Sequence, residues 1–126
     1  MRISFWLALI CCSCSSIKNT SVTDSPCIEN LKFKDEFVRR LNIIDDFMAI
    51  ESKEFTNIDE YESVMTEQKI ADFNSSLIFI SKYTHVSFES MANYNRTYPF
   101  GVYEKDKINW LKWYEENKCK NIQFKK

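Results

Sequence analysis

Glycine and proline are almost absent from this chain of 126 residues, which contains one Gly and two Pro. Tight turns depend on these two residue types, and all-β folds need many tight turns. Their scarcity argues against an all-β fold and favours helices joined by short polar loops. Ten Phe and six Tyr supply bulky side chains for a core. We therefore expect a single all-α domain, a small bundle of three to four helices.

Histidine is nearly absent as well, since His85 is the only one in the chain. Zinc sites use Cys and His ligands at characteristic spacings, and no C-x-x-C pair occurs after residue 26. We therefore expect no metal and no cofactor. The net charge of -1 gives no reason to expect a nucleic-acid partner. The charge is nevertheless uneven, because acids predominate from Asp35 to Asp72 and bases from Lys105 to Lys126.

The first residues have the pattern of an export signal. Arg2 supplies a positive charge, and the apolar run Ile3–Ile10 after it is too short to cross a bilayer. A group of cysteines and serines follows. This arrangement resembles a bacterial lipoprotein signal, in which the Cys that directly follows a small residue is lipidated and becomes the new N-terminus. The residues that match are Cys14, Ser13 before it, and Ser15 and Ser16 after it.

The resemblance implies a signal peptide over 1–13, a palmitate-type lipid on Cys14 and a membrane anchor. The Ser- and Thr-rich stretch 14–26 is then expected to be a flexible tether, and 27–126 the helical domain. Cleavage before Cys11 or Cys12 is an alternative within the same interpretation. A secretory signal cleaved near Ser16, with no lipid, is the other alternative.

Two cysteines remain in the expected mature domain, Cys27 and Cys119. Exported domains commonly pair such cysteines, so we predict one disulfide that joins the two ends of the domain. Two free thiols are the alternative.

Apolar periodicity predicts where the helices lie. A stripe at spacings of three and four residues predicts a helix from Phe33 to Lys53. Two further helices are expected over 58–66 and 67–83, separate or joined as one bent helix. Asn57 with Glu60, and Thr66, are the expected N-terminal capping residues. The apolar run Leu77–Ile80 is expected to be deeply buried, with a β-strand there as the alternative. The stripe residues of the first helix are Phe33, Phe37, Leu41, Ile44 and Met48.

The last helix is expected from Glu104 to Lys118. Ile108, Leu111 and Tyr114 fall on one side of it, and two Trp residues widen that side. We therefore expect the other helices to dock against this one. Its ending resembles the C-terminal helix of small uncharacterised exported bacterial proteins, which implies a small helical domain and no particular activity. The residues that match are Trp110, Trp113, Tyr114, Asn117 and Lys118.

The stretch from Thr84 to Tyr103 shows little periodicity and is expected to be an irregular, aromatic-rich loop with a turn at Pro99-Phe100-Gly101. Long ordered loops often carry function. The alternative is a loop that only closes one end of the core. The residues of this candidate binding loop are His85, Asn93, Asn95 and Arg96.

The sequence contains no nucleophile elbow, P-loop, dinucleotide-binding motif or metal-ligand spacing. We therefore predict a non-enzymatic accessory or partner-binding protein of a bacterial cell envelope. It would be held on a membrane by its lipid, facing the periplasm or the surface, or else be secreted. An immunity or inhibitor protein that binds an exported protein through the acidic middle helices is the specific version. The alternatives are an envelope hydrolase using His85 with Glu89 or Arg96, and an aromatic-lined carbohydrate- or peptide-binding module.

Overall fold

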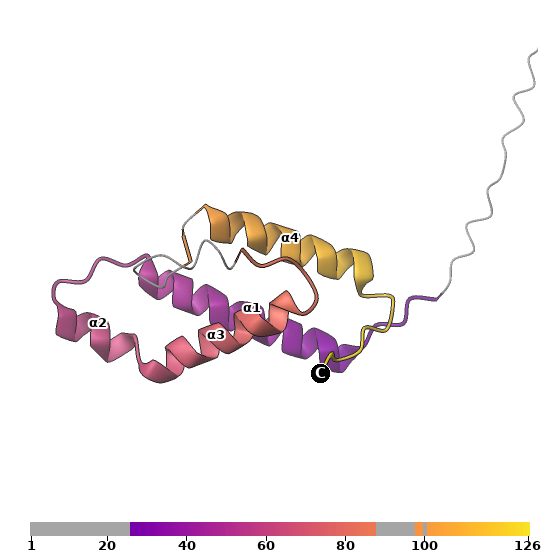
Figure 1. The fold of residues 1–126 in the computed structure, drawn as a ribbon, viewed down its shortest axis with the longest axis horizontal. Coiled ribbons are helices and arrows are strands. Elements are labelled where there is room, and N and C mark those ends of the chain that lie inside the picture. Colours follow the sequence, from indigo (N-terminus) through magenta and orange to yellow (C-terminus); the bar gives the residue numbers. More distant parts are fainter. Residues whose placement is uncertain (1–25, 88–97, 100) are drawn as a thin grey trace, which may run out of the picture.

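The computed structural model describes residues 26–87, 98–99 and 101–126, and within those ranges it contains four helices and no strand (Figure 1). The prediction of an all-α fold is confirmed. None of the described helices is both long and apolar enough to cross a membrane. Cys14 and the other residues of 1–25 lie outside the described part. The helices are α1 (Leu31–Glu51), α2 (Ile58–Val64), α3 (Glu67–Ser81) and α4 (Val102–Asn117).

Helix α1 is the element that the other helices cover. Its N-cap is Asn30, whose side-chain oxygen accepts a hydrogen bond from the N–H of Phe33 at 3.2 Å. Helices α3 and α4 lie along two sides of it (Figure 1). The prediction that the other helices dock against the last helix, α4, was therefore wrong, because the central helix is α1. The predicted stripe is buried in full: Phe33, Phe37, Leu41, Ile44 and Met48 are each at most 7% exposed.

Helix α3 packs on α1 through one aromatic stack and a row of aliphatic side chains. The rings of Phe47 and Phe73 lie 3.9 Å apart and nearly parallel, and Leu77 and Ile80 are fully buried. Ile78 is 54% exposed, so the prediction that the run from Leu77 to Ile80 is buried all round was wrong. A helix packed on one neighbour buries one side only, and the strand alternative is excluded because the run is helical.

Helix α4 buries only part of the side that was predicted to face the core. Ile108 and Leu111 are 66% and 44% exposed, whereas Trp110 is fully buried and Tyr114 is 7% exposed. Bulky aromatic side chains remove more apolar area from water than Ile or Leu, and the helix is rotated so that these rings face the core. The predicted turn before it is present: Pro99 O accepts from the N–H groups of the first two helical residues, and Gly101 has a positive φ of 79°.

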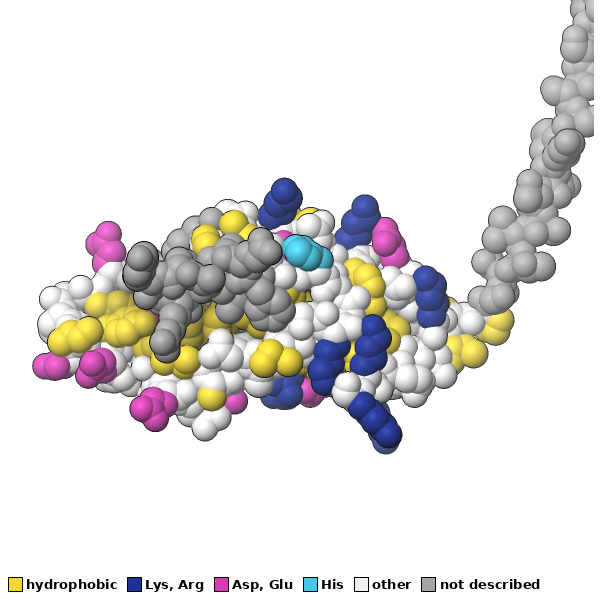
Figure 2. Space-filling model, viewed as in Figure 1, with side chains coloured by type: hydrophobic (Ala, Val, Ile, Leu, Met, Phe, Trp, Pro, Cys, Tyr) yellow, Lys and Arg dark blue, Asp and Glu magenta, His cyan; other side chains and the backbone are white. Residues whose placement is uncertain are grey.

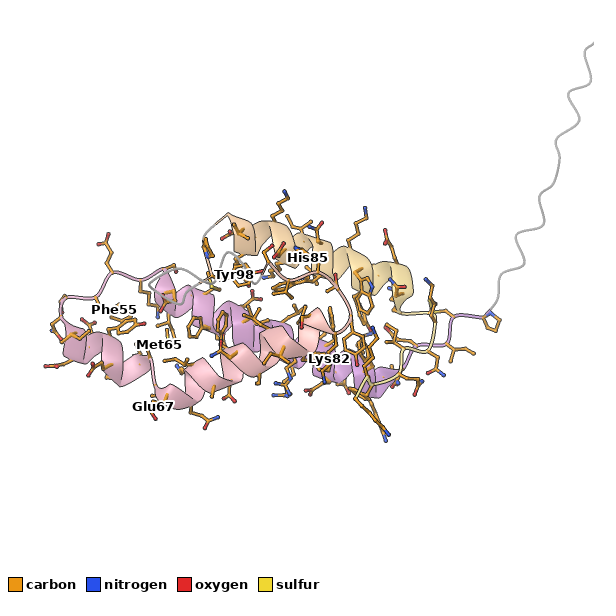
Figure 3. The ribbon with its side chains drawn as sticks, in the orientation of Figure 1. Phe55, Met65, Glu67, Lys82, His85 and Tyr98 are labelled. Atoms are coloured by element: carbon orange, nitrogen blue, oxygen red, sulfur yellow. A yellow bond between two sulfur atoms is a disulfide. The ribbon has the colours of Figure 1, made fainter. Side chains whose placement is uncertain are left out.

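Helix α2 is a short, weakly anchored element between α1 and α3. Asn57 caps it as predicted, accepting from the N–H of Glu60 at 2.9 Å. Glu60 accepts instead from the N–H and hydroxyl of Thr56, at 3.0 and 2.7 Å. Thr66 caps α3, which makes α2 and α3 separate helices. No residue of α2 is buried; Figure 3 shows Phe55 and Met65 at its two ends pointing inward.

The chain ends of the domain are joined as predicted. A disulfide connects Cys27 and Cys119, whose Cα atoms lie 4.4 Å apart. Beside it, the N–H of Asn121 donates to Ile28 O at 2.9 Å, and the Asn30 amide donates to Ile122 O at 2.7 Å. The C-terminal segment therefore crosses the start of α1 and fastens the end of α4 to it.

Removing the disulfide should lower the free energy of unfolding by about 4 to 5 kcal/mol, because the bond closes a loop of 92 residues in the unfolded chain. Urea unfolding of the Cys27→Ser/Cys119→Ser variant, beside the native protein with and without reductant, measures this. The variant and the reduced protein should agree. If reductant leaves the urea midpoint unchanged, the two cysteines are not paired in solution.

Candidate functional site

Of the four residues of the predicted binding loop, only His85 lies in the described part of the chain. Its backbone carbonyl accepts a hydrogen bond from the indole N–H of Trp110 at 2.6 Å. Its imidazole is exposed, with Nε2 3.3 Å from the hydroxyl of Ser87. Asn93, Asn95 and Arg96 lie outside the described residues, so the binding loop stays a prediction.

A buried carboxylate that the sequence analysis missed joins this loop to α4. Asp106 is 4% exposed, and its Oδ2 accepts hydrogen bonds from the hydroxyl of Tyr98 and, at 3.0 Å, from the N–H of Ser87. Ser87 and Tyr98 stand on the two sides of the stretch 88–97. Asp106 therefore holds both described ends of the loop. The available signal was an acidic residue between Tyr103 and Trp110, within the apolar stripe of a helix.

Burial raises the pKa of the Tyr98 hydroxyl, and its hydrogen bond to the Asp106 carboxylate raises it further. The phenol is therefore neutral in the folded protein well above the pH at which an exposed tyrosine ionises. A neutral donor held against a buried carboxylate satisfies both groups, which is a structural role.

A second carboxylate, that of Asp45 on α1, is half-buried and joins two helices. Asp45 accepts from both the hydroxyl of Tyr103 and the ammonium of Lys107, the latter at 2.7 Å and 2.8 Å. It therefore ties α1 to α4. Asp46 points elsewhere, as expected for adjacent residues on a helix, and lines a hollow between α1 and α3.

The two Trp residues of α4 do not form an exposed platform for a sugar ring. Trp110 is fully buried, and half-buried Trp113 lies with its ring 6.0 Å from Phe37 and 5.9 Å from Tyr83. The expected use of both in core packing is confirmed.

The hollow between the second half of α1 and the first half of α3 has a volume of about 370 Å³. Its apolar lining comes from Ile43, Phe47 and Ile50, and charged side chains surround that lining. The Asp72 carboxylate accepts from the Gln68 amide at 3.0 Å. Among the described residues, none of the other three charged groups makes an ion pair; these are Asp46, Lys53 and Lys69.

The half of the molecule that holds the hollow ends in a concentration of negative charge, which we call the acidic tip. Between Glu51 and Glu67 the chain carries six acidic residues and one lysine, and all but Glu51 of the six are exposed. Figure 2 shows acidic side chains over the α2 end of the molecule, around exposed hydrophobic groups. The tip consists of Glu51, Glu54, Asp59, Glu60, Glu62 and Glu67.

Two carboxylates of the acidic tip also support its local structure. Glu60 is stabilised in its charged form by the hydrogen bonds from Thr56, which lower its pKa. Glu51 accepts from the Tyr61 hydroxyl at 2.8 Å, and burial followed by this contact raises the pKa of Tyr61 to about 12. Within the described part of the chain, the other four carboxylates of the tip make no hydrogen bond or ion pair, and of these Asp59 and Glu62 lie on α2 itself.

The described residues contain no group of three or more acidic, His or Cys side chains able to hold a metal ion. Compared with known protein families, curated protein sequences and solved structures, the chain matches none.

Replacing Tyr98 by Phe should lower the free energy of unfolding by about 1 to 3 kcal/mol, because Asp106 then loses a buried donor. Urea unfolding at pH 7 measures this, and Tyr83→Phe, at a half-buried ring, is the matched control with a smaller effect.

The native protein should also lose stability as pH rises above about 10, where the unfolded chain ionises Tyr98 and the folded chain does not. The free energy of unfolding of Tyr98→Phe should fall less steeply with pH in this range. An equal fall in the variant and the native protein would contradict the assignment of Tyr98 as a buried, neutral donor to Asp106.

Proposed function

We propose that this protein is a non-enzymatic, lipid-anchored accessory protein of a bacterial cell envelope, whose helical domain binds another envelope or exported protein through the acidic tip. The observation that carries the proposal is the position of the tip. It lies at the opposite end of the long axis from the point where the chain leaves the domain toward residue 25 (Figure 1). A domain held at its disulfide end would present the tip to its surroundings.

The chemistry of the tip indicates a basic partner. Its carboxylates outnumber the nearby lysine Lys53 by six to one, and such a field speeds the approach of a positively charged surface and rejects acidic ones. The hollow beside it offers apolar contacts with Phe47 and Ile50 inside a charged rim. An apolar side chain surrounded by basic residues would match both features, as in the anchoring residues of protein interfaces. An immunity or inhibitor protein acting on an exported protein is the specific form we favour.

Export is supported by the pairing of Cys27 with Cys119, because disulfides persist in oxidising compartments. The lipoprotein-like segment around Cys14 supplies the anchor in this proposal. Lipid chains contribute about 0.8 kcal/mol per buried methylene, so two or more would hold the domain on a membrane.

The intact mass of the protein from its membrane fraction tests the anchor. The expected mass is that of the chain from Cys14 with acyl chains attached, and it should rise by the mass of two hydrogens on reduction, for one disulfide. Replacing Cys14 by Ser should leave a protein that a high-salt wash removes from the membrane fraction, whereas the acylated protein should resist the same wash. A full-length mass without acyl chains would contradict the anchor and with it the location.

A photo-crosslinking residue at Ile58 tests the binding surface. Ile58 is 64% exposed on α2, and Ile108 on α4 is a matched control at 66%. In the envelope, Ile58 should give a discrete product with one protein and Ile108 should not. Asp59→Lys with Glu62→Lys should reduce that product by at least tenfold, because both charges at the contact are reversed.

The control for charge is Asp35→Lys with Glu116→Lys, which changes the net charge equally at two exposed acids away from the tip. It should leave the Ile58 product unchanged. Glu60 is kept because its carboxylate accepts hydrogen bonds from Thr56 and so supports the start of α2. Products of equal yield from Ile58 and Ile108, or a product insensitive to the reversal at the tip, would contradict the assignment of this surface.

A further inference from the structure

The end of the molecule opposite the acidic tip is rich in uncompensated lysine, and we call it the basic end. The start of α1, the end of α3 and the C-terminal segment meet there: Lys125 donates from its backbone to the Tyr83 hydroxyl at 2.7 Å and from its ammonium to Lys82 O at 2.5 Å. Figure 2 shows Lys and Arg side chains gathered over this half. The basic end consists of Lys32, Lys82, Lys120, Lys125 and Lys126.

The acids of this end are already occupied. Ion pairs join Glu29 to Lys34, Glu36 to Arg39 and Arg40, Glu115 to Lys118, and Glu116 to Lys112. Among the described residues, Asp35 is the one side-chain carboxylate of this end without an ion pair. None of the five lysines of the basic end pairs with a described carboxylate either, and all five are exposed. The ammonium groups of Lys120 and Lys125 donate only to neutral oxygens, those of Asn117 and Lys82.

Exposed apolar side chains lie among these lysines. Ile28 is 57% exposed, Leu31 63% and Phe124 49%. The Phe124 ring lies 5.6 Å from that of Phe33 and also lines an open hollow of about 600 Å³. The charged residues of its lining are Lys32, Arg39 and Lys125, with the carboxylates of Asp35 and Glu36. Lysines around exposed aliphatic and aromatic groups are the composition of surfaces that enter the headgroup region of a bilayer, where the ammonium groups meet lipid phosphates.

We infer that the basic end docks on the surface of a membrane containing anionic lipid, with Leu31, Ile28 and Phe124 entering the interface. Its position supports this occupant, because the chain leaves the domain toward residue 25 beside Cys27, at this same end (Figure 1). The opposite charge of the tip would then be repelled from the anionic surface, so the long axis stands away from it. This positional support rests on the anchor of the proposed function, whereas the charge and the exposed apolar groups of the basic end do not, and the test below uses a chain with neither a lipid on Cys14 nor a partner at the tip.

Vesicle sedimentation of the chain without its first 14 residues tests the inference free of any acyl chain. This chain retains the whole described core and the Cys27–Cys119 disulfide. It should sediment with phosphatidylglycerol vesicles and not with phosphatidylcholine vesicles. Binding should fall at high salt, because the Debye length shrinks from about 10 Å at 0.1 M to about 3 Å at 1 M. No sedimentation with either vesicle, or equal sedimentation with both, overturns the inference.

Lys32→Gln/Lys82→Gln/Lys126→Gln should lower the partition coefficient by on the order of a hundredfold, since each lysine near an anionic surface contributes roughly fivefold. Lys53→Gln/Lys69→Gln/Lys105→Gln changes the net charge equally, away from the basic end, and should leave binding within about twofold. Equal losses in the two variants mean that only net charge matters and overturn the inference.

Leu31→Asn separates a bilayer from a soluble polyanion, and Ile58→Asn is its matched control. Both positions are the first residue of a helix, at 63% and 64% exposure. Leu31→Asn should lower vesicle binding several-fold and Ile58→Asn should not. Binding that depends on the lysines could instead be unchanged by Leu31→Asn and be abolished by soluble polyphosphate competing at the same site. That result identifies a polyanion site and overturns the assignment to a membrane. Failure here leaves the crosslinking at Ile58 unaffected, so the two proposals are judged separately.

Discussion

The buried stripe of α1 must be covered on two sides, and the rest of the structure depends on how that is done. Phe33, Phe37 and Ile44 are almost completely removed from water, and neither α3 nor α4 alone is wide enough to cover them. Helix α3 contributes Phe73 and Leu77 from one side, and α4 contributes aromatic rings from the other. Because α4 approaches from one side only, just one of its faces is buried, which leaves Ile108 and Leu111 in solvent.

Polar contacts complete what the core begins, and each joins elements that are distant in the sequence. Asp45 holds Lys107 and Tyr103 across α1 and α4. Asp106 holds the two described ends of the loop. At one end of the bundle the Cys27–Cys119 disulfide and the C-terminal segment close the structure. At the other end α2 has no buried residue and few contacts. Stability is therefore concentrated at the disulfide end, and the acidic tip is supported locally by its caps.

The two ends of the molecule differ in charge because the fold brings acidic segments together at one end and lysine-rich segments together at the other. The acids of 51–67 stay together since the chain turns back there through α2. The lysines meet at the other end because α3 stops at Lys82 where α1 begins, and the C-terminal segment crosses both. One end suits a basic partner and the other an anionic surface. Both proposed interactions thus follow from one separation of charge along the long axis.

The sequence by itself determined the helical class, the α1 stripe, and the caps at Asn57 and Thr66, because these depend on local periodicity and capping chemistry. It also determined the disulfide, because Cys27 has one other cysteine, Cys119, to pair with in the expected mature domain. Only the tertiary structure decided which side of α4 is buried, why Ile78 is exposed, and that Asp45 and Asp106 are partners of the core. A helical repeat shows that a face is apolar, but burial depends on how many neighbours approach it and from where. The candidate surfaces follow the same rule, since charges spread along the chain become a tip or an end only when the helices fold back on one another.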